Sequence, residues 1–364
     1  MIEYIGIENF RNHKEIRFDI DNAKIIVFCG RNGIGKTNLL EAISIIDGSK
    51  GLKGSKINEL KQINELKSNL NQQEFKICID VNGNRIILES IKSRKKFKLN
   101  RTSIPTFYEV TEIINTIWTS PDLEYLFFSS QKTRRDFFDK LTFCFFKNHY
   151  KLLNDCDDLL SQRLKILVEN ISDGFKVIDN IELEIAKLIY QIVNNRINAI
   201  SMINNNIDKT ENEISKFSIS CLIKYLELDI FKNNSLDNTI AKISSLLKSQ
   251  RLTDAATKQN SFSHNKFTIN MNFENNNDFN LMSSGQIKFV LISICFAFAK
   301  TMKQNFPKRT IILLLDDFMS KLDYKNSQIL LAKLEQWDYG QVFITSTSGL
   351  SIKQDNLLYK IFNL

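Results

Sequence analysis

The sequence predicts an α/β protein with a mixed β-sheet, interrupted by a second lobe that is entirely helical. Strand-like runs and glycine turns fill the first part of the chain and return after residue 265. Between them, residues 135–250 carry apolar side chains at helical spacing and almost no glycine. No proline occurs between Pro121 and Pro307, which leaves room for long uninterrupted helices. We therefore expect residues 1–134 and 251–364 to be the two halves of one domain, with the helical lobe at residues 135–250.

The composition is that of an ordinary globular protein. The chain has 364 residues, of which 43% are hydrophobic and 25% charged. With 49 Lys and Arg against 41 Asp and Glu, the net charge is +8. This balance permits a polyanionic partner without requiring one.

Several classes of protein are excluded. The longest strongly apolar run, residues 289–299, is about half a membrane span. Met1 is not followed by a signal-peptide pattern. Six scattered cysteines form no CxxC pair, and three histidines show no metal-ligand spacing, which argues against a zinc site. We expect a cytoplasmic protein with reduced thiols and no membrane partner.

The first strands are indicated by two kinds of pattern. Residues 15–20 alternate polar and apolar side chains, as a half-buried strand does. Residues 24–29 form a short apolar run that ends at a glycine, which is typical of a buried central strand. Further along, residues 75–81 and 86–88 flank the pair Asn82-Gly83, and this arrangement predicts a β-hairpin.

The helical lobe is indicated by two apolar series with helical spacing. The first series is Leu152, Cys156, Leu159, Leu160, Leu164 and Leu167, and the second is Ile181, Ile185, Leu188, Ile192, Ala199 and Ile203. These helices could also belong to one continuous α/β core, and the sequence leaves that alternative open.

The strongest motif lies between the strand at residues 24–29 and the helix that follows it. Gly30-x-x-x-x-Gly35-Lys36-Thr37 is a complete P-loop pattern in the required context. Glycines let the backbone approach phosphate oxygens, and the amides lie at the positive end of a helix dipole. Lys36 would act catalytically between the β- and γ-phosphates, and Thr37 would ligate Mg²⁺. The predicted ATP-binding residues are Gly30, Arg31, Asn32, Gly33, Ile34, Gly35, Lys36, Thr37 and Asn38.

A second carboxylate for the metal is expected at the end of a neighbouring strand. Residues 311–315 are five apolar residues followed by Asp316 and Asp317. Asp316 is the predicted Mg²⁺ ligand, and Asp317 is the predicted catalytic group that polarises the attacking water. The alternative for Asp317 is that it only caps the following turn.

A third motif lies 33 positions before Asp316. Ser283, Ser284, Gly285 and Gln286 begin an apolar helix, where small hydroxyl residues and a helix dipole can bind a second anion. As a lone tetrapeptide it could equally be a simple helix N-cap. It resembles the signature motif of ABC-type ATPases, which contacts ATP bound to the opposite subunit. This resemblance implies an ATP-dependent homodimer, and it makes Asp323, in the segment after Asp317, a residue that reaches across the dimer.

Taken together, the motifs resemble those of the RecF family of bacterial DNA repair proteins, relatives of the SMC ATPases. The resemblance runs nearly end to end. The matching segments are residues 9–12 (Asn-Phe-Arg-Asn), 32–42, 120–123 (Ser-Pro-Asp-Leu), 134–139 (Arg-Arg-x-Phe-x-Asp), 162–163 (Gln-Arg), 283–286 and 313–317.

The resemblance implies a fold and a function. The fold would be an ABC/SMC-type P-loop ATPase head with a helical lobe and no long coiled-coil arm. Arg11 and Asn12 would join the nucleotide site. ATP would drive dimerisation and DNA binding, and with RecO and RecR the protein would help load RecA at single-strand gaps and stalled forks, in replication, repair and the SOS response. Hydrolysis would be slow and would release DNA. The alternative function is an SMC-like structural DNA-binding ATPase without a mediator role.

The sequence departs from the family pattern at three places. Residues 262–265 read Phe-Ser-His-Asn where the family has Gly-Pro-His-Arg, so only His264 is kept. Asp317 stands in place of a glutamate, which predicts sluggish turnover. Lys50 and Lys53 stand where the family often has an arginine, and lysine lacks its bidentate fork.

Two basic clusters are candidates for contact with DNA. Residues 92–101 hold six basic side chains without an acid, and their alternation predicts an edge strand with a basic face. Lysines that keep an edge strand from aggregating are an equal alternative. The second cluster is Lys132, Arg134 and Arg135, and its arginines could instead pair with Asp136 or Asp139. Because no base-reading module is present, we expect recognition of the backbone of single-stranded, duplex or gapped DNA.

Overall fold

The structure is a computed structural model of the whole chain. It describes the residues 1–21, 23–49, 51–61, 75–120, 123, 126, 129–169, 174–207, 217–233, 235–273, 282–317, 320, 322, 324–347 and 358–364. The chain divides into two compact units: Met1–Tyr125 with Leu281–Leu364 form unit 1, and Leu126–Asn280 form unit 2. Each unit is described by itself below.

A parallel sheet is the centre of unit 1. In the described residues its strand order is β13-β3-β12-β11-β8, and all four pairings are parallel. The strands are β3 (Ile25–Cys29), β8 (Ile114–Thr119), β11 (Thr310–Leu315), β12 (Gln341–Ser346) and β13 (Tyr359–Asn363). Every residue of β3, β11 and β12 is buried, as their unbroken apolar runs require in a sheet that is covered on both faces. The sheet therefore brings together strands from both ends of the sequence.

An antiparallel sheet accompanies it. Its strand order is β2-β1-β4-β5-β6-β7. The strands are β1 (Ile2–Phe10), β2 (His13–Asp19), β4 (Lys76–Val81), β5 (Asn84–Ile91), β6 (Arg94–Leu99) and β7 (Thr102–Ile104). Asn82 and Gly83 both have positive φ, at 47° and 72°, and they join β4 to β5, so the predicted hairpin is confirmed. The α/β fold expected from the sequence is thus confirmed, but the single mixed sheet that we expected is instead two sheets, one parallel and one antiparallel.

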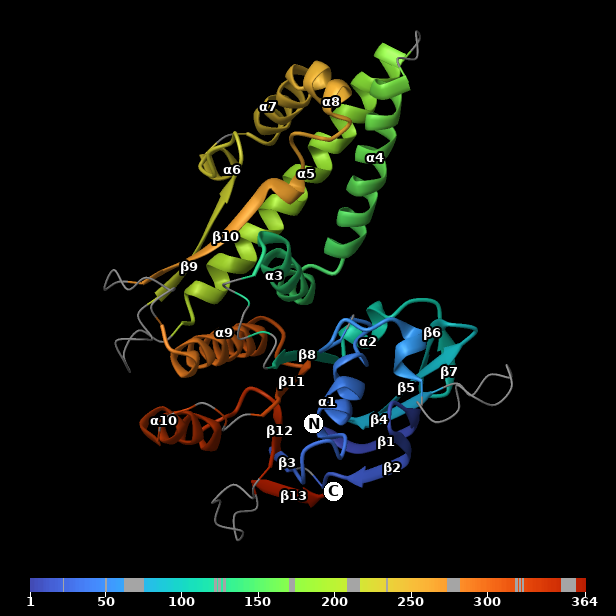
Figure 1. Ribbon diagram of the computed structural model, residues 1–364, viewed down its shortest axis with the longest axis vertical. Helices are drawn as coiled ribbons and strands as arrows, with labels where there is room; N and C mark the ends of the chain where they lie inside the picture. Colours follow the sequence, from blue (N-terminus) through green and yellow to red (C-terminus); the bar gives the residue numbers. More distant parts are fainter. Residues whose placement is uncertain are drawn as a thin grey trace. The chain divides into compact units, whose positions relative to one another are not determined.

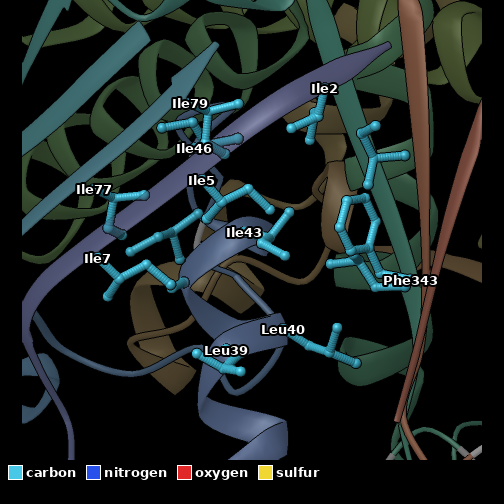
Figure 2. Close-up of a cluster of buried hydrophobic side chains, with 14 of the residues drawn as sticks. Ile2, Ile5, Ile7, Leu39, Leu40, Ile43, Ile46, Ile77, Ile79 and Phe343 are labelled. Atoms are coloured by element: carbon cyan, nitrogen blue, oxygen red, sulfur yellow. The ribbon is translucent and has the colours of Figure 1, made fainter. Parts of the chain in front are cut away.

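The main core of unit 1 lies between these two sheets. Helix α1 (Lys36–Ser44) presents apolar side chains to both, while α9 (Ser284–Asn305) and α10 (Tyr324–Glu335) lie on the other face of the parallel sheet (Figure 1). Figure 2 shows α1 side chains packed against β1 and β4, with Phe343 of β12 closing the cluster. Each such side chain contributes about 1.5–3 kcal/mol when it is fully buried. The ten labelled residues are Ile2, Ile5, Ile7, Leu39, Leu40, Ile43, Ile46, Ile77, Ile79 and Phe343. This packing fixes the helix that begins at the P-loop.

Helix α9 is apolar on nearly all sides. By length and hydropathy it is the one helix in the described parts of the chain that could cross a membrane, with a mean hydropathy of 1.4. However, 78% of that stretch is buried inside the structure, as in the core helix of a globular protein. The burial of α9 is therefore explained by its packing on the parallel sheet.

Unit 2 is mostly helical. Its helices are α3 (Gln131–Phe145), α4 (His149–Glu169), α5 (Gly174–Asn204), α6 (Ile230–Asn233), α7 (Leu236–Ser249) and α8 (Arg251–Thr257). Helices α4 and α5 pack along one another (Figure 1). A two-stranded antiparallel ribbon, β9 (Phe217–Ile223) with β10 (Phe267–Phe273), lies beside α5.

The ribbon corrects one detail of the sequence analysis. Strand β9 lies inside residues 135–250, where we expected helices alone. Phe217, Ile219 and Ile223 are buried in it, while Ser218 and Leu222 are exposed. The unit is also wider than the range 135–250, since it includes α8 and β10.

Buried arginines hold unit 2 together. Arg163, fully buried on α4, donates to Glu182 (2.8 Å), to Asp254 (2.7 Å) and to the carbonyl of Leu247 (2.8 Å). Arg196 on α5 makes a bidentate pair with Asp139 at 2.7 and 2.8 Å. Arg163 of the Gln-Arg segment and Asp139 of the Arg-Arg-x-Phe-x-Asp segment thus have structural partners in this unit.

The interpretation of Arg134 and Arg135 as a basic cluster also needs correction. Arg134 donates to the carbonyl of Ile269 at 3.0 Å, and Arg135 donates to the carbonyl of Phe267 at 3.1 Å. Both guanidinium groups therefore reach the backbone of β10. Asp139, which we considered as their partner, is paired with Arg196 instead.

Candidate nucleotide-binding site

The P-loop connects β3 to α1. Two of its glycines have positive φ, Gly33 at 83° and Gly35 at 108°. A Cβ atom on Gly35 would lie 2.5–2.6 Å from the side chains of Asn12 and His13, whereas one on Gly33 would meet nothing within 4 Å. Gly35 is therefore required by both conformation and close packing, and Gly33 by conformation.

The N-terminus of α1 has no side-chain cap. Its N-cap residue is Gly35, whereas α3 and α7 begin at Ser130 and Ser235, whose hydroxyls each accept a backbone amide. The first amides of a helix have no partner within the helix. In α1 they include those of Lys36 and Thr37, at the positive end of the helix dipole. This arrangement suits a bound anion.

Lys36 lies across the loop. Its Nζ donates to the carbonyl of Gly30 at 2.6 Å and to that of Arg31 at 2.9 Å, and the residue is 9% exposed. The backbone carbonyls hold the ammonium group beside the loop amides. A positive charge is thus added to the same small region.

Thr37, at the start of α1, contacts Asp316. The Thr37 Oγ1 lies 3.0 Å from both carboxylate oxygens of Asp316. Asp316 follows directly after β11, and it is 5% exposed. Burial raises the pKa of Asp316, although hydrogen bonds from Thr345 and Thr37 oppose that shift. The structure thus brings together the two predicted metal ligands, which are the hard oxygen donors that Mg²⁺ prefers.

Thr345 supports this carboxylate from the neighbouring strand β12. Its Oγ1 donates to Asp316 Oδ1 at 2.7 Å and accepts the amide of Asp317 at 2.8 Å. The sequence analysis missed this role, since the apolar run at residues 342–344 gives no sign of which strand lies beside it. In the structure β12 lies between β3, which precedes the P-loop, and β11, which precedes Asp316.

Asp317 has a left-handed backbone. Its φ is 50°, which is uncommon for a residue with a side chain. Its carbonyl accepts hydrogen bonds from the amide and the hydroxyl of Ser320, at 3.1 and 2.9 Å. A catalytic role for Asp317 stays a prediction.

The turn between β1 and β2 packs on the P-loop. Asn12 donates to the carbonyl of Ile34 at 2.9 Å and accepts from Asn38 at 2.8 Å. His13, which the sequence analysis did not single out, lies 3.1 Å from the carbonyl of Gly35. Burial lowers the pKa of His13. Asn12 and Asn38 therefore lie beside the loop, and their contact with a nucleotide stays a prediction.

Arg11 is turned toward Glu41 rather than toward the loop. It makes a bidentate pair with Glu41 at 2.7 and 2.8 Å, and it also donates to Ser55 Oγ and to the carbonyl of Glu59. Lys53 lies 3.9 Å from the same carboxylate. Glu41 is 1% exposed and was not predicted as a functional residue. A lone acid in the apolar run after Asn38 is the signal that could have revealed it.

The Ser-Ser-Gly-Gln segment begins α9. Ser283 and Gln286 form a reciprocal capping box, with Ser283 Oγ accepting the Gln286 amide and Gln286 Oε1 accepting the Ser283 amide. Ser283 and Ser284 are exposed and Gly285 is buried. The helix N-cap that we considered as an alternative is thus present in the structure. Contact of this segment with a second nucleotide stays a prediction. Asp323, Lys50, Pro121 and Asp122 lie outside the described residues.

The basic stretch at residues 92–101 is not a full edge strand. β7 pairs with β6 at Phe97, Lys98 and Leu99, and Phe97 is buried. Lys98 pairs with Glu89 at 2.8 Å and Lys95 donates to the carbonyl of Ser49 at 2.8 Å. Arg94 and Lys96 are exposed. Only part of this stretch is thus a basic surface.

A P-loop beside an aspartate-bearing parallel strand, with a capped Ser-Ser-Gly-Gln helix on the same sheet, defines the class of ABC-type P-loop ATPases. The chain belongs to the family described as RecF/RecN/SMC N terminal domain, whose model matches residues 1–364. The predicted resemblance to the RecF family is confirmed.

Curated relatives and solved structures agree with this assignment. The chain is 32% identical over 356 residues to a protein of Rickettsia typhi, and 33% identical over 369 residues to one of Rickettsia prowazekii. Each is named DNA replication and repair protein RecF, and each match covers 94% of this chain and 93% of the relative. One solved structure, of the recombination mediator protein RecF-ATPrS in the RecFOR pathway, is 22% identical with a TM-score of 0.82 and covers 100% of this chain and 96% of that one. Another, described as RecF-ATP, has a TM-score of 0.78, 22% identity and coverage of 97% and 95%. At this identity the solved structures support the fold.

Proposed function

We propose that this protein binds ATP with Mg²⁺ at the P-loop and uses the bound nucleotide to dimerise on DNA. The observation that carries the proposal is the distance of 3.0 Å between Thr37 Oγ1 and both carboxylate oxygens of Asp316. A hydroxyl and a buried carboxylate beside an uncapped helix N-terminus match what a Mg²⁺–triphosphate complex needs.

Each residue of the loop has a role in this proposal. The amides of Gly33, Gly35, Lys36 and Thr37 would donate to phosphate oxygens, and the Lys36 ammonium would lie between the β- and γ-phosphates. Thr37 and Asp316 would hold Mg²⁺, which supplies charge neutralisation to the phosphates when it is bound. Residues 30–32 and Ile34 would shape the loop, and Asn12 and Asn38 would line its side.

Arg11 would contribute indirectly. Its guanidinium is engaged by Glu41, Ser55 and the Glu59 carbonyl, so it would support the wall beside the nucleotide. This refines the expectation that Arg11 binds the nucleotide itself.

The signature segment would complete the site of a second copy. Ser283 and Ser284 are exposed at the positive end of α9, so they are accessible to a γ-phosphate carried by a partner protomer. Asp317 would polarise the attacking water, and Asp323 would reach across the dimer. Hydrolysis would be slow and would act as a switch that releases DNA.

The biological role follows the relatives. Proteins of the family are named for DNA replication and repair, and the solved relatives are described as mediators in the RecFOR pathway. We infer that this protein acts with RecO and RecR in the cytoplasm, helps load RecA at single-strand gaps and stalled forks, and takes part in the SOS response. The exposed Arg94 and Lys96 would contact the phosphate backbone of single-stranded, duplex or gapped DNA.

Sedimentation with and without ATP and Mg²⁺ tests the first part of the proposal. We expect nucleotide to raise the dimer fraction in the presence of DNA, and we expect Lys36→Met to abolish that rise. Lys303→Met, which changes an exposed lysine of α9, is the matched control and should dimerise as the parent does. A protein that stays monomeric under all conditions would refute the switch.

Binding to single-stranded, duplex and gapped DNA across a salt series tests the second part. A preference for gapped DNA that needs ATP supports the mediator role. ATP-dependent binding that is equal on all three favours a structural SMC-like ATPase.

A further inference from the structure

Lys288 is a buried lysine that the proposed function leaves without a role. It lies on α9, five positions after Ser283, and is 2% exposed. Its Nζ donates to the carbonyl of Asp317 at 2.5 Å, to the carbonyl of Ser320 at 3.1 Å and to Ser320 Oγ at 3.0 Å. Because a buried ammonium is costly unless its donors are satisfied, these three acceptors fix one orientation of the side chain.

The contact partner of Lys288 is itself unusual. Asp317 has a φ of 50°, a conformation that persists in a residue with a side chain only where the surroundings enforce it. Its amide donates to Thr345 Oγ1 at 2.8 Å, and its carbonyl accepts from Lys288 and from Ser320. The peptide group before the Asp317 Cα and the one after it are therefore both fixed by hydrogen bonds. The direction in which the Asp317 side chain leaves the backbone is then fixed as well.

We propose that Lys288 is a positioning residue, which orients the Asp317 carboxylate and links it to α9. This helix, which begins with the Ser-Ser-Gly-Gln segment, is called the signature helix below. This inference rests on the proposed function, in which Asp317 polarises the attacking water. Lys288 lies just over one helical turn after the exposed Ser283 and Ser284 on the same helix. A phosphate that binds at the start of α9 therefore acts on the same rigid element that holds the backbone of Asp317.

A purely structural role for Lys288 would change different measured quantities from those that a positioning role changes. If the lysine only stabilised the loop after β11, its loss would lower the melting temperature and weaken nucleotide binding. A positioning role lowers the rate of the chemical step and leaves the affinity for ATP nearly unchanged.

The test compares Lys288→Met with Lys303→Met. Lys303 lies on the same helix, is exposed and donates to the carbonyl of Pro307, so it controls for the loss of a lysine–carbonyl hydrogen bond. Single-turnover ATP hydrolysis, ATP affinity and melting temperature are measured for each variant. We expect Lys288→Met to slow hydrolysis about 10-fold or more with the ATP affinity within about 2-fold of the parent, and Lys303→Met to change neither.

A double-mutant cycle separates positioning from other effects. In an Asp317→Asn background the Lys288→Met change should have no further effect on the rate, because the group that it aims is already lost. Ser320→Ala removes one acceptor of Lys288 and one donor to the Asp317 carbonyl, so it gives a milder variant if Lys288→Met does not fold. It should slow hydrolysis less than Lys288→Met, and again only when Asp317 is present.

The outcomes are distinguishable. The inference is overturned if Lys288→Met, or Ser320→Ala in its place, hydrolyses ATP at the parent rate, or if its effect is the same with and without the Asp317 carboxylate. If the parent protein hydrolyses no more ATP than Lys36→Met, the hydrolytic step of the proposed function fails instead.

Discussion

Thr345 joins Asp316 to the adjoining peptide of Asp317. Its hydroxyl donates to the Asp316 carboxylate at 2.7 Å and accepts the amide of Asp317 at 2.8 Å, with the side chain almost completely buried. Two consecutive residues of the proposed hydrolytic site are thus anchored to the next strand of the parallel sheet through one oxygen atom.

Replacement of Thr345 by valine should uncouple these residues. The side-chain shape is kept, while a buried carboxylate loses a donor and a buried amide loses its acceptor. We expect a loss of about 1–3 kcal/mol in the free energy of unfolding and weaker Mg²⁺-dependent ATP binding, measured by urea unfolding and by equilibrium titration. Thr257→Val, at an exposed hydroxyl on α8, should change neither quantity. Unchanged ATP binding in Thr345→Val would show that the contact is dispensable.

Asp316→Asn should stabilise the protein without nucleotide while it abolishes Mg²⁺ binding. Burial raises the pKa of Asp316 above its ordinary value, so ionisation of this group at neutral pH opposes folding. A neutral amide removes that penalty, and we expect the variant to have the higher free energy of unfolding at pH 7. The measurement is thermal unfolding of parent and variant, with and without Mg²⁺ and ATP. If the variant is the less stable without ligands, the carboxylate stabilises the fold rather than opposing it.

The P-loop half of this site could be predicted from sequence, and the supporting half could not. Lys36, Thr37 and Asp316 belong to contiguous motifs whose spacing is set by backbone geometry, so their chemistry is readable without a structure. Thr345, Glu41, His13 and Lys288 act through contacts between segments that lie far apart in the sequence, and the order of strands in the sheet decides those contacts.

Strand β9 was missed for a different reason. Phe217 and Ile219 are buried and Ser218 between them is exposed, which is the period of two of a strand. The helical series before these residues led us to expect a helix here as well. The roles of Arg134 and Arg135 were unpredictable because their acceptors are backbone carbonyls, which carry no sequence signal.

Loss of Arg163 should severely destabilise unit 2. This fully buried guanidinium pairs with Glu182 and Asp254, which are also fully buried. In Arg163→Leu both carboxylates lose this partner, and removal of one member of a buried ion pair costs about 3–5 kcal/mol. Urea unfolding measures this loss. Lys187→Met breaks an exposed pair with Glu184 instead and should cost at most about 0.5 kcal/mol. Equal effects of the two changes would contradict the importance of the buried network.

The stability of unit 2 should fall as the pH drops below about 6.5. Burial, together with the charge of Arg196, lowers the pKa of His264 to about 3. In the unfolded chain this imidazole takes up a proton near its ordinary pKa, whereas in the folded chain it stays neutral, so the unfolded state binds more protons between these two values. One such group gives a slope of at most about 1.4 kcal/mol per pH unit. His149, close by and also with a lowered pKa, acts in the same direction.

His264→Gln isolates this contribution. Its free energy of unfolding should fall less than that of the parent between pH 7 and pH 5, even if the variant is less stable at pH 7. Asp139 affects stability only at more acidic pH. Burial alone would raise the pKa of Asp139, but Arg196 and His149 hold that pKa well below its usual value. The stabilisation that the ionised Asp139 provides is therefore lost only below the pH range in which His264 acts. Parallel pH profiles of parent and variant would exclude His264 as the source of the slope.

A charge reversal at Ser284 tests whether the site is shared between two protomers. Ser284 is exposed in the first turn of α9 and lies outside the Ser283–Gln286 capping box, so a glutamate there suits the helix dipole and should leave the monomer stable. The same carboxylate would repel a phosphate that a partner presents. We therefore expect Ser284→Glu to bind ATP as the parent does and yet to remain monomeric in sedimentation, while the neutral Ser284→Gln dimerises to a greater extent. A mixture of Ser284→Glu with Lys36→Met should regain part of the ATP-dependent dimer, because such a heterodimer holds one intact pair of P-loop and signature helix. If the mixture stays as monomeric as its components, the signature helix does not complete the site of a second copy.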